Sequence, residues 1–394
     1  MVKKLAILTS GFKPVPAIKG GAVEQLVTDM VEANEQEHQY DIDLYTLYDQ
    51  SLFRFKYKYT NLIMIHDPQK NLFLRILHSV LRRTVNRHKS INYVSREMVK
   101  NFKRNYYDAI LVENNMETYE LINKVRSKEK LFFHLHNDFD NGDSEKTKER
   151  TLCIINTATN ILVVSNYLKE KLKRYGAKNV STVYNFVNDN KLKRVNTKDK
   201  IKLRKKYDLK ENDIIFTYVG RLDREKGIDK LLEAMTYLNN KKNIKCLVIG
   251  NKFFGSLEEA EYEKKLQIII KKVKNKVVFT GYVDNSELYK FYAISDCVVI
   301  PTQVEEAFGM VALEAMRAKK PVIATRSGAL PEILPSEGAI ILNKNDTLGL
   351  SKSMIKIASD EKLRKRMGQI NYVAGKKFAH NNHEYFSSVI ESLD

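Results

Sequence analysis

The sequence predicts an α/β protein built from two doubly wound, Rossmann-like domains. Short apolar runs alternate with amphipathic stretches along the 394 residues. Such runs are typical of parallel strands that are buried on both faces, and the amphipathic stretches supply the crossover helices. The length fits two domains of this kind. The alternation restarts once, after a charged stretch near the middle of the chain.

The first series of strands precedes residue 190. The segment MVKKLAILTSGF has the basic start of a signal peptide, but we interpret it as the first strand. Its apolar run is short, and loop residues follow it. A helical pattern runs from about Gly21 to Ala33. Further strands are predicted in YDIDLYTLY, NLIMIH, DAILVEN, LFFHLHND and NILVVSN.

The second series begins after the charged stretch DNKLKRVNTKDKIKLRKKYDLKEND, which we interpret as a linker that leads into a helix. A strand in IIFTYVGRL is followed by a helix from about Gly227 to Leu238. Further strands are predicted in IKCLVIGN, KVVFTGYV, DCVVIPT, PVIATRSG and GAIILN. We therefore place the domain boundary near residue 190, with domains at 1–190 and 191–374.

Neither a metal site nor a membrane span is expected. The three cysteines (Cys153, Cys246 and Cys297) and the eight histidines show no metal-ligand spacing. No apolar run reaches the roughly 18 residues of a membrane-spanning helix.

Ligands of doubly wound sheets bind beyond the carboxyl ends of the strands, so the residues in the loops after the strands are candidates for a binding site. Gly20 and Gly21 open the helix after the first strand. Adjacent glycines allow close approach of the backbone, and a helix N-terminus favours an anion. A plain turn is the alternative. A GxGxxG dinucleotide fingerprint is absent at this position.

The loop GRLDREKGID carries two cations just before a predicted helix. Arg221 can hold two phosphate oxygens, and Lys226 adds a point charge near the helix N-terminus. These two residues suit a diphosphate. Two solvated surface charges are the alternative.

The segment EEAFGMVALEAM places two acids around a predicted helix start. Gly309 lies at the N-terminus of a helix from about Met310 to Ala318. A carboxylate accepts hydrogen bonds from hydroxyl groups and repels phosphate. Glu314 therefore suits a ribose and Glu306 a second sugar, with phosphate between them. An ordinary exposed position for Glu314 is the alternative.

Together these loops resemble the retaining glycosyltransferases of the GT-B fold, glycosyltransferase family 4 (glycosyl transferases group 1). The motifs GRLDREKG, FTGYV and EEAFGMVALEAMRAKKPVIATRSGALPEIL occur in the family's order, and the resemblance covers nearly the whole chain. It implies two Rossmann-like domains that face a central cleft. It also implies that the C-terminal helix, 375–394, crosses back to the N-terminal domain.

The resemblance implies roles for individual residues. Arg221 and Lys226 would bind the donor diphosphate, Glu314 the ribose and Glu306 the donor sugar. Gly21 would lie against the diphosphate, and His136 would be the active-site histidine, in preference to His134. The base and sugar pockets would be completed by Tyr282, Val283, Phe308, Gly309, Met310 and Val311. The chain departs from the family at NFV (Asn185–Val187), where NGV is usual, and at EEAF, where EGF is usual.

The family transfers a sugar from a nucleotide-sugar with retention and, in most members, without a metal. We therefore expect a UDP-sugar donor, no cofactor and no metal. Arg221, Lys226 and helix N-termini would neutralise the phosphates. The departing diphosphate would deprotonate the incoming hydroxyl, while Glu306 and His136 orient the sugar.

The net charge of +19 indicates a polyanionic partner or a generally lysine-rich composition. Residues 70–104 hold ten Lys or Arg and one acid, Glu97. Leu72, Ile76, Leu77, Val80, Leu81 and Val85 fall at helical spacing among arginines, as in a basic amphipathic helix. Before them, Phe53–Tyr59 alternates aromatic and cationic residues, which predicts a strand. We expect an acceptor on a glycan or lipid diphosphate, and a cytoplasmic protein at the inner membrane face. The alternative is a helix packed on its own sheet.

Competing functions remain open. A catalytically silent GT-B subunit would be free to lose Arg221, Lys226, Glu306 and Glu314, all of which are present. A nucleic-acid-binding protein is suggested by charge alone, and we expect no nucleic-acid partner. A GT-B epimerase shares the fold but not the Glu-x7-Glu loop. The leading hypothesis is a transferase for surface polysaccharide or glycolipid synthesis.

Overall fold

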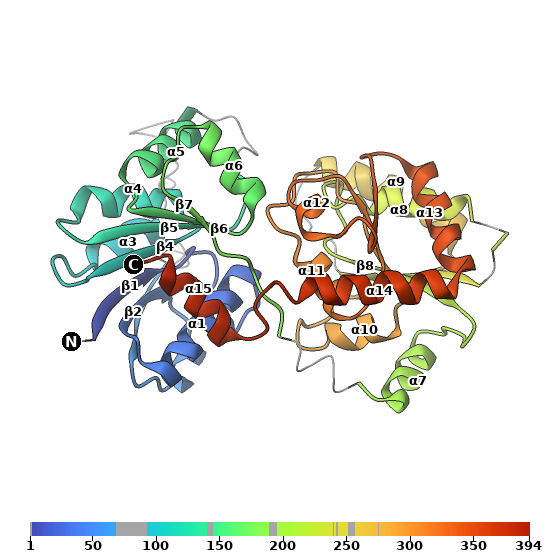
Figure 1. Ribbon diagram of the computed structural model, residues 1–394, viewed down its shortest axis with the longest axis horizontal. Helices are drawn as coiled ribbons and strands as arrows, with labels where there is room; N and C mark the ends of the chain where they lie inside the picture. The colour runs from blue at the N-terminus through green and yellow to red at the C-terminus, as the bar shows by residue number, and fades with distance from the viewer. Residues whose placement is uncertain are drawn as a thin grey trace. The chain divides into compact units, whose positions relative to one another are not determined.

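The computed structural model describes residues 2–67, 93–139, 145–188, 195–238, 240–241, 243–250, 257–274 and 276–394. It divides the chain into two units (Figure 1). Unit 1 contains the residues up to Tyr184 together with Asn382–Asp394, and unit 2 contains Asn185–Asn381. The basic amphipathic helix expected within residues 70–104 falls mostly in 68–92, which lie outside the described residues.

Unit 1 is a parallel sheet with helices on both faces. Its strands are β1 (Lys3–Leu8), β2 (Tyr40–Leu47), β3 (Thr60–Ile65), β4 (Ala109–Glu113), β5 (Lys130–Leu135), β6 (Asn160–Val163) and β7 (Val180–Thr182). The sheet order is β3-β2-β1-β4-β5-β6-β7, and every pairing is parallel. The strand order therefore reverses between β1 and β4, where doubly wound sheets bind ligands.

The helices of unit 1 follow the strands in alternation. They are α1 (Ala22–Glu37), η1 (Gln50–Arg54), α3 (Tyr93–Lys100), α4 (Met116–Val125), α5 (Glu145–Thr157), α6 (Asn166–Arg174) and α15 (Asn382–Glu391). Strand β1 is central, and Leu5, Ala6, Ile7 and Leu8 are all fully buried. A strand covered on both faces needs such a continuous apolar run, which is why KKLAIL reads without polar alternation.

The last helix of the chain belongs to unit 1. Helix α15 packs against α1 (Figure 1). Its Tyr385, Phe386 and Val389 are fully buried. The chain reaches this position from α14 (Glu361–Gly375), the last helix of unit 2. The terminal apolar stripe thus completes the core of the N-terminal unit.

The expected strand over Phe53–Tyr59 is wrong. Residues 50–54 form the short helix η1, and the following residues make no strand before β3. The backbone N–H groups of Lys58 and Tyr59 donate to the carboxylate of Glu35, at 2.5 and 3.0 Å. Because a side chain on α1 takes these donors, they are not available for a strand ladder. The alternation of aromatic and basic residues carried no information about that partner.

Unit 2 is a second parallel sheet. Its strands are β8 (Ile214–Val219), β9 (Ile244–Ile249), β10 (Val277–Gly281), β11 (Cys297–Ile300), β12 (Val322–Thr325) and β13 (Ala339–Leu342). Their order is β10-β9-β8-β11-β12-β13, again all parallel. The helices are α7 (Thr197–Lys206), α8 (Ile228–Thr236), α9 (Leu257–Val273), α10 (Leu288–Ile294), α11 (Met310–Arg317), α12 (Leu330–Ile333), α13 (Thr347–Ser359) and α14. The order reverses between β8 and β11.

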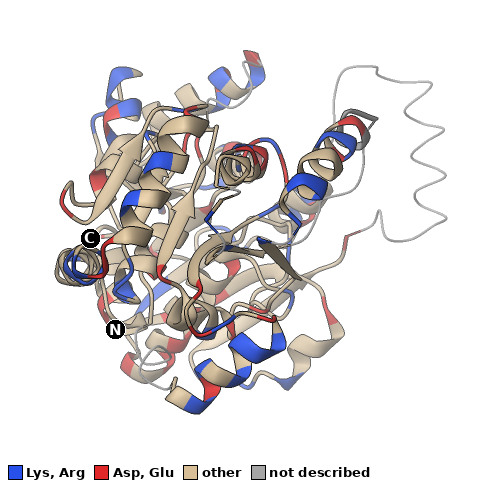
Figure 2. Cartoon of the chain, turned by 90° about the vertical axis from the view of Figure 1, so that its right-hand side faces the viewer, with Lys and Arg blue, Asp and Glu red and all other residues tan. Residues whose placement is uncertain are grey.

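Lys and Arg are interspersed with Asp and Glu along the helices (Figure 2). Helix α7 is the most basic of the described helices by sequence, since TKDKIKLRKK carries six cations and one acid, and none of its residues is buried. No helix among the described residues is both long and apolar enough to span a bilayer.

Candidate functional site

The predicted donor-binding residues of unit 2 all follow the carboxyl ends of strands. Arg221 and Lys226 lie in the loop between β8 and α8, and Tyr282 and Val283 follow β10. Glu306 lies in the loop after β11. Phe308 and Gly309 come just before α11, and Met310, Val311 and Glu314 lie within it. The fold thus gathers them at one edge of the sheet, on both sides of the point where its strand order reverses.

Two loop glycines, Gly220 and Gly250, and the last residue of β10, Gly281, hold the ends of β8, β9 and β10 together. The N–H of Gly220 donates to Ile249, and the N–H of Gly250 donates to Gly281, both at 3.0 Å. A Cβ added to Gly250 would lie 1.9 Å from the carbonyl oxygen of Gly220. Only glycine fits there, so the loop with Arg221 and the segment with Tyr282 are fixed to neighbouring strand ends. Tyr282 itself is 65% exposed.

The loops after β8 and β11 are joined by an ion pair. Lys226 Nζ lies 2.6 Å from Glu306 Oε1, and both side chains are largely covered. The backbone carbonyl of Glu225 also accepts from the N–H of Gln303 at 2.7 Å. The two residues expected to face phosphate and sugar therefore touch directly.

Arg221 is held by its own loop. Its guanidinium pairs with Asp223 at 3.0 Å and Glu225 at 2.9 Å, and the side chain is 46% exposed. The hydroxyl of Tyr218 donates to the Arg221 carbonyl. A guanidinium that is paired with carboxylates but partly exposed can still present N–H donors to an anion.

A turn after β12 fixes the backbone of Glu306. The N–H of Ala329 donates to the Glu306 carbonyl at 2.9 Å, and the Glu306 N–H donates to Ser327 Oγ at 3.2 Å. Gly328 has φ 46°, and a Cβ there would lie 2.1 Å from the Glu306 carbonyl oxygen. The segment RSGALPE, which the sequence motif contains, is thus the support of the acidic loop.

The N-terminus of α11 carries no side-chain cap. Gly309 occupies the N-cap position with φ 104°. A side chain there would collide with Leu330, since an added Cβ would lie 2.5 Å from Cδ2. The first N–H groups of a helix have no acceptor within it, so Met310 and Val311 offer donors to an anion. The Phe308 side chain instead enters the core against Phe378.

Glu314 is paired with a tyrosine that the sequence motif did not indicate. The hydroxyl of Tyr292, on α10, donates to Glu314 Oε2 at 2.5 Å. Burial raises the pKa of Glu314 to about 7, and the hydrogen bond from Tyr292 opposes that rise. The carboxylate is thus oriented by α10 and titrates near neutrality. No sequence pattern reveals Tyr292, because α10 and α11 meet only in the tertiary structure.

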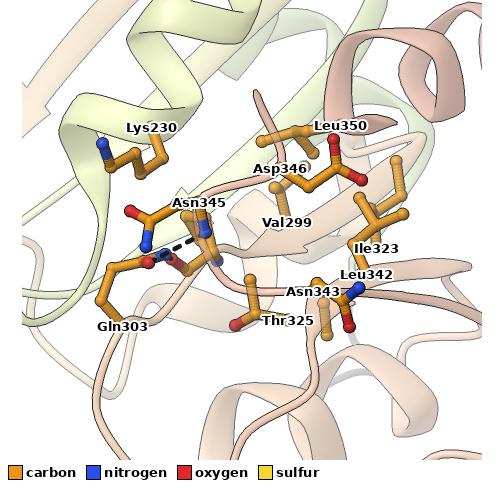
Figure 3. A pocket seen from close by; sticks show the side chains of 12 residues that line it. Lys230, Val299, Gln303, Ile323, Thr325, Leu342, Asn343, Asn345, Asp346 and Leu350 are labelled. Atoms are coloured by element: carbon orange, nitrogen blue, oxygen red, sulfur yellow. Dashed lines mark hydrogen bonds between the residues drawn. The ribbon is translucent and has the colours of Figure 1, made fainter. Parts of the chain in front are cut away.

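A separate small pocket lies beyond the ends of β11, β12 and β13 (Figure 3). Its empty volume is about 260 Å³, including space open to solvent, and its lining includes Lys230, Gln303 and Asp346. Gln303 Oε1 accepts from the Asn345 N–H at 3.1 Å across it. None of the predicted donor-binding residues lines this pocket.

In unit 1, Gly21 precedes α1 with φ 116° and no side-chain cap. The buried carboxylate of Glu24 lies beneath it, since an added Cβ would lie 2.0 Å from Glu24 Oε2. Glu24 Oε1 accepts from Ser10 Oγ at 2.9 Å. An anion at this helix N-terminus would therefore lie close to a carboxylate, which the sequence reasoning did not consider.

His136 follows β5 and is buried in a cluster with Glu113 and His134. Its Nε2 lies 2.7 Å from Glu113 Oε2, and His134 Nδ1 lies 3.2 Å from the same oxygen. Burial lowers the pKa of His136 to about 4, with repulsion from His134 adding to the shift. Burial alone would raise the pKa of Glu113, but the two histidines lower it to about 2. His136 is therefore neutral and Glu113 ionised near pH 7.

The cluster brings together side chains of metal-ligand type, although the sequence predicts no metal. Sequence reasoning also missed Glu113. The available signal was its place at the end of a predicted strand, in DAILVEN. Asn114 and Asn115 then connect three strand ends. Asn114 Oδ1 accepts from the His136 N–H at 3.0 Å, and Asn115 Nδ2 donates to the Ser10 carbonyl at 2.9 Å.

Comparison with solved structures defines the class of protein first. The chain is similar to *Anabaena* Alr3699/HepE in complex with UDP, with a TM-score of 0.75, 17% identity and 99% of each chain covered. It is also similar to sucrose-phosphate synthase from *Thermosynechococcus elongatus*, with a TM-score of 0.77, 20% identity and coverage of 99% and 98%. The fold is the GT-B glycosyltransferase fold, with a Rossmann-like domain in each unit.

A family model matches the sequence of unit 2. Residues 199–373, less than half of the chain, match the model "Glycosyl transferases group 1". The lipopolysaccharide 1,2-N-acetylglucosaminetransferase of *Salmonella typhimurium* is 33% identical over 229 residues, 57% of this chain and 56% of the relative. The capsular polysaccharide biosynthesis glycosyltransferase CapM of *Staphylococcus aureus* is 32% identical over 218 residues, 54% and 55%. These alignments span about half the length of each relative.

Proposed function

We propose that this protein is a retaining glycosyltransferase that moves a sugar, of hexose type, from a UDP-sugar to a glycan or a lipid-diphosphate-linked acceptor. The observation that carries the proposal is the pairing of Lys226 with Glu306 beside the uncapped N-terminus of α11. In a group 1 domain, this edge supplies a cation and free N–H groups for phosphate and a carboxylate for sugar hydroxyls. The HepE and lipopolysaccharide relatives support the choice of donor and acceptor class.

The chemistry follows from the charges at this edge. Arg221, Lys226 and the first N–H groups of α11 would stabilise the negative charge that develops on the departing diphosphate. The departing phosphate would deprotonate the acceptor hydroxyl on the same face of the sugar, which gives retention. Glu306 would accept hydrogen bonds from the sugar hydroxyls, and Glu314 would accept from the ribose diol. Because protein cations would carry the phosphate charge, we propose that no metal is required.

The experiment that tests the function is release of nucleoside diphosphate. Wild type, Glu306→Gln and Arg221→Ala are given a panel of nucleotide-sugars with membrane extract as acceptor. Release with one donor, lost in both variants, is the expected result. Arg366→Ala is the matched control, since Arg366 is exposed on α14, far along the chain from the donor loops. No release with any donor, despite tight UDP binding, would favour a catalytically silent subunit.

Two further measurements separate the finer parts of the proposal. The anomeric configuration of the product, read by NMR, tests retention, and an inverted product would contradict it. Activity after EDTA treatment tests independence from metals. Partition of labelled product into organic solvent distinguishes a lipid-linked acceptor from a free glycan.

We also propose cytoplasmic localisation with peripheral contact to an anionic membrane. The support is the net charge of +19 and the arginines of the sequence between residues 70 and 92. Exposed cations attract anionic lipid at roughly 1 kcal/mol each near the surface. The test is co-sedimentation with vesicles of neutral lipid, with and without anionic lipid.

The membrane test has a matched control in unit 2. Arg75, Arg82, Arg83 and Arg87 are changed to Gln in one variant. In the other, four exposed lysines of α7 are changed to Gln: Lys198, Lys200, Lys202 and Lys205. Binding lost only in the arginine variant supports contact through that segment. Equal loss in both would show that net charge alone decides binding.

A further inference from the structure

The cluster of Glu113, His134 and His136 follows from strand geometry. Glu113 ends β4 and is the direct partner of His134 on β5. Side chains two residues apart on a strand lie on the same face. His136 therefore points to the same side as His134, and their ring centroids lie 4.0 Å apart. One carboxylate thus faces two imidazoles at the edge of the unit 1 sheet where ligands of such folds bind.

The contacts determine where the protons are. An ionised carboxylate only accepts hydrogen bonds, so each ring nitrogen that faces it must carry the hydrogen. These nitrogens are Nε2 of His136, at 2.7 Å, and Nδ1 of His134, at 3.2 and 3.4 Å from the two oxygens. In a neutral imidazole the other nitrogen is then a bare acceptor. For His136, which is neutral near pH 7, that acceptor is Nδ1.

The two ring nitrogens that do not face Glu113 have no partner among the described residues. Nδ1 of His136 and Nε2 of His134 are buried and make no hydrogen bond to any residue that the structure describes. A buried acceptor without a partner costs free energy unless a ligand or water supplies a donor. The backbone of His136 is fixed as well, because Asn114 Oδ1 accepts from its N–H at 3.0 Å. His136 is thus held at its backbone N–H by Asn114 and at Nε2 by Glu113.

We propose that Glu113 is a positioning residue that takes the Nε2 hydrogen of His136 and leaves Nδ1 as the acceptor for a hydroxyl of the transferred sugar. This inference rests on the proposed glycosyltransferase function. Glu113 acts through His136 and does not itself touch the substrate. His134 completes the arrangement by donating a second hydrogen bond to the same carboxylate, which a buried carboxylate needs.

A metal ion held by the same three residues fits the geometry less well. Two ligand atoms bound tetrahedrally to one zinc ion at about 2.0–2.1 Å would lie roughly 3.3 Å apart. The Glu113–His136 separation of 2.7 Å is that of a hydrogen bond. The three side chains are therefore joined by hydrogen bonds and not by a metal ion. The metal content of the purified protein distinguishes the two cases.

The test is ¹⁵N NMR of the full-length protein labelled at histidine, which reads the tautomer of each ring. His136 should carry hydrogen on Nε2 and His134 on Nδ1, with signals assigned from single substitutions. The tautomers are read in wild type, and the substitutions serve only to assign its signals. Three results would overturn the proposal: the opposite tautomer for His136, an imidazolium form of His136 at pH 7, or one equivalent of bound metal in the purified protein.

The role in the reaction is tested with Glu113→Gln. We expect kcat to fall about tenfold to a hundredfold with a smaller change in KM, and the His136 ¹⁵N shifts to move. Asp43→Asn is the matched control, because it also neutralises a buried carboxylate of unit 1, one bonded to Lys103 and Tyr107. Asp43→Asn should leave the His136 shifts unchanged. Unchanged kcat in a folded Glu113→Gln would overturn the positioning role.

Failure of the two proposals can be told apart. If no donor is turned over by wild type, the glycosyltransferase function fails, whatever the tautomers. If wild type is active, donor analogues that each lack one hydroxyl identify the group that His136 accepts from. The sensitive analogue should lose activity in wild type but little more in Glu113→Gln. Equal and independent losses in both would overturn the link between Glu113 and that hydroxyl.

Discussion

Lys226 Nζ and Glu306 Oε1 lie 2.6 Å apart, which joins the loop after β8 to the loop after β11. A diphosphate that binds Lys226 must compete with this carboxylate for the ammonium group. The ion pair therefore keeps a cation and an anion aligned before any ligand arrives, and it links phosphate binding to the position of the sugar-facing acid.

This pairing predicts opposite effects of two substitutions. Lys226→Ala should weaken UDP binding about tenfold or more, because it removes a charge-assisted contact to phosphate. Glu306→Gln should leave UDP affinity equal or tighter, since Lys226 is released, while turnover falls about a hundredfold. Titration calorimetry and nucleoside diphosphate release measure the two effects. Lys362→Ala, on the exposed face of α14, is the control for loss of a lysine.

Glu314 predicts a pH dependence of nucleotide binding. Burial raises its pKa to about 7, so its ionised fraction increases as the pH rises through neutrality. A carboxylate accepts from both ribose hydroxyls, whereas the protonated acid accepts less well. UDP affinity should therefore fall by up to about tenfold between pH 8 and 6.

The control for this prediction is Glu314→Gln, whose residual pH dependence reports the phosphates of UDP. Tyr292→Phe removes a hydrogen bond that lowers the pKa of Glu314, so the binding profile should shift to higher pH. An identical profile in wild type and Glu314→Gln would show that this carboxylate does not titrate with binding.

Two glycines with positive φ, Gly227 in the β8–α8 loop and Gly176 after α6, predict graded losses of stability. A Cβ on Gly227 would lie 1.9 Å from the Pro301 carbonyl oxygen, at φ 68°. Gly227→Ala should therefore lower the melting temperature strongly, through both a clash and backbone strain of about 1 kcal/mol. Gly176 has φ 93° and nothing within 4 Å of an added Cβ. Gly176→Ala should show the strain alone. An equal fall in melting temperature in the two variants would show that the contact with Pro301 does not contribute to the effect.

The lowered pKa of His136 predicts that acid destabilises the folded protein. Burial lowers its pKa from 6.5 to about 4, so the unfolded chain takes up a proton at a pH where the folded one does not. The free energy of unfolding should fall as the pH drops from 6.5 towards 4, by about 3 kcal/mol at most from this residue. Glu113, whose pKa is lowered to about 2, adds a further loss below 4.5.

Melting temperatures across this pH range test the effect against His136→Asn, which has no group to titrate. The variant should lose less stability than wild type between pH 6.5 and 4. Parallel curves for the two proteins would mean that His136 keeps an ordinary pKa in the folded state.

The placement of the candidate donor-binding residues around one helix N-terminus could be predicted because these residues lie near one another in the sequence. The Glu306–Glu314 segment spans a loop and one helix, so Gly309 could be placed at a helix N-terminus from the pattern alone. The contacts that hold this segment in place could not be predicted in the same way. Tyr292 reaches Glu314 from another helix, and Ser327 reaches the Glu306 backbone from another strand end. Such partners depend on strand order, which local periodicity does not encode.

The sequence by itself determined the two parallel sheets, since continuous apolar runs have no other stable place than between layers of helices. It also determined the types of chemistry in the loops, because those depend on residue identity. The tertiary structure decided which groups meet. Phe53–Tyr59 is not a strand, because Glu35 on α1 takes its backbone donors. Glu113 faces His136 because β4 and β5 are neighbours. Hydrogen bonds act over about 3 Å, so such contacts exist only once distant segments have been brought together.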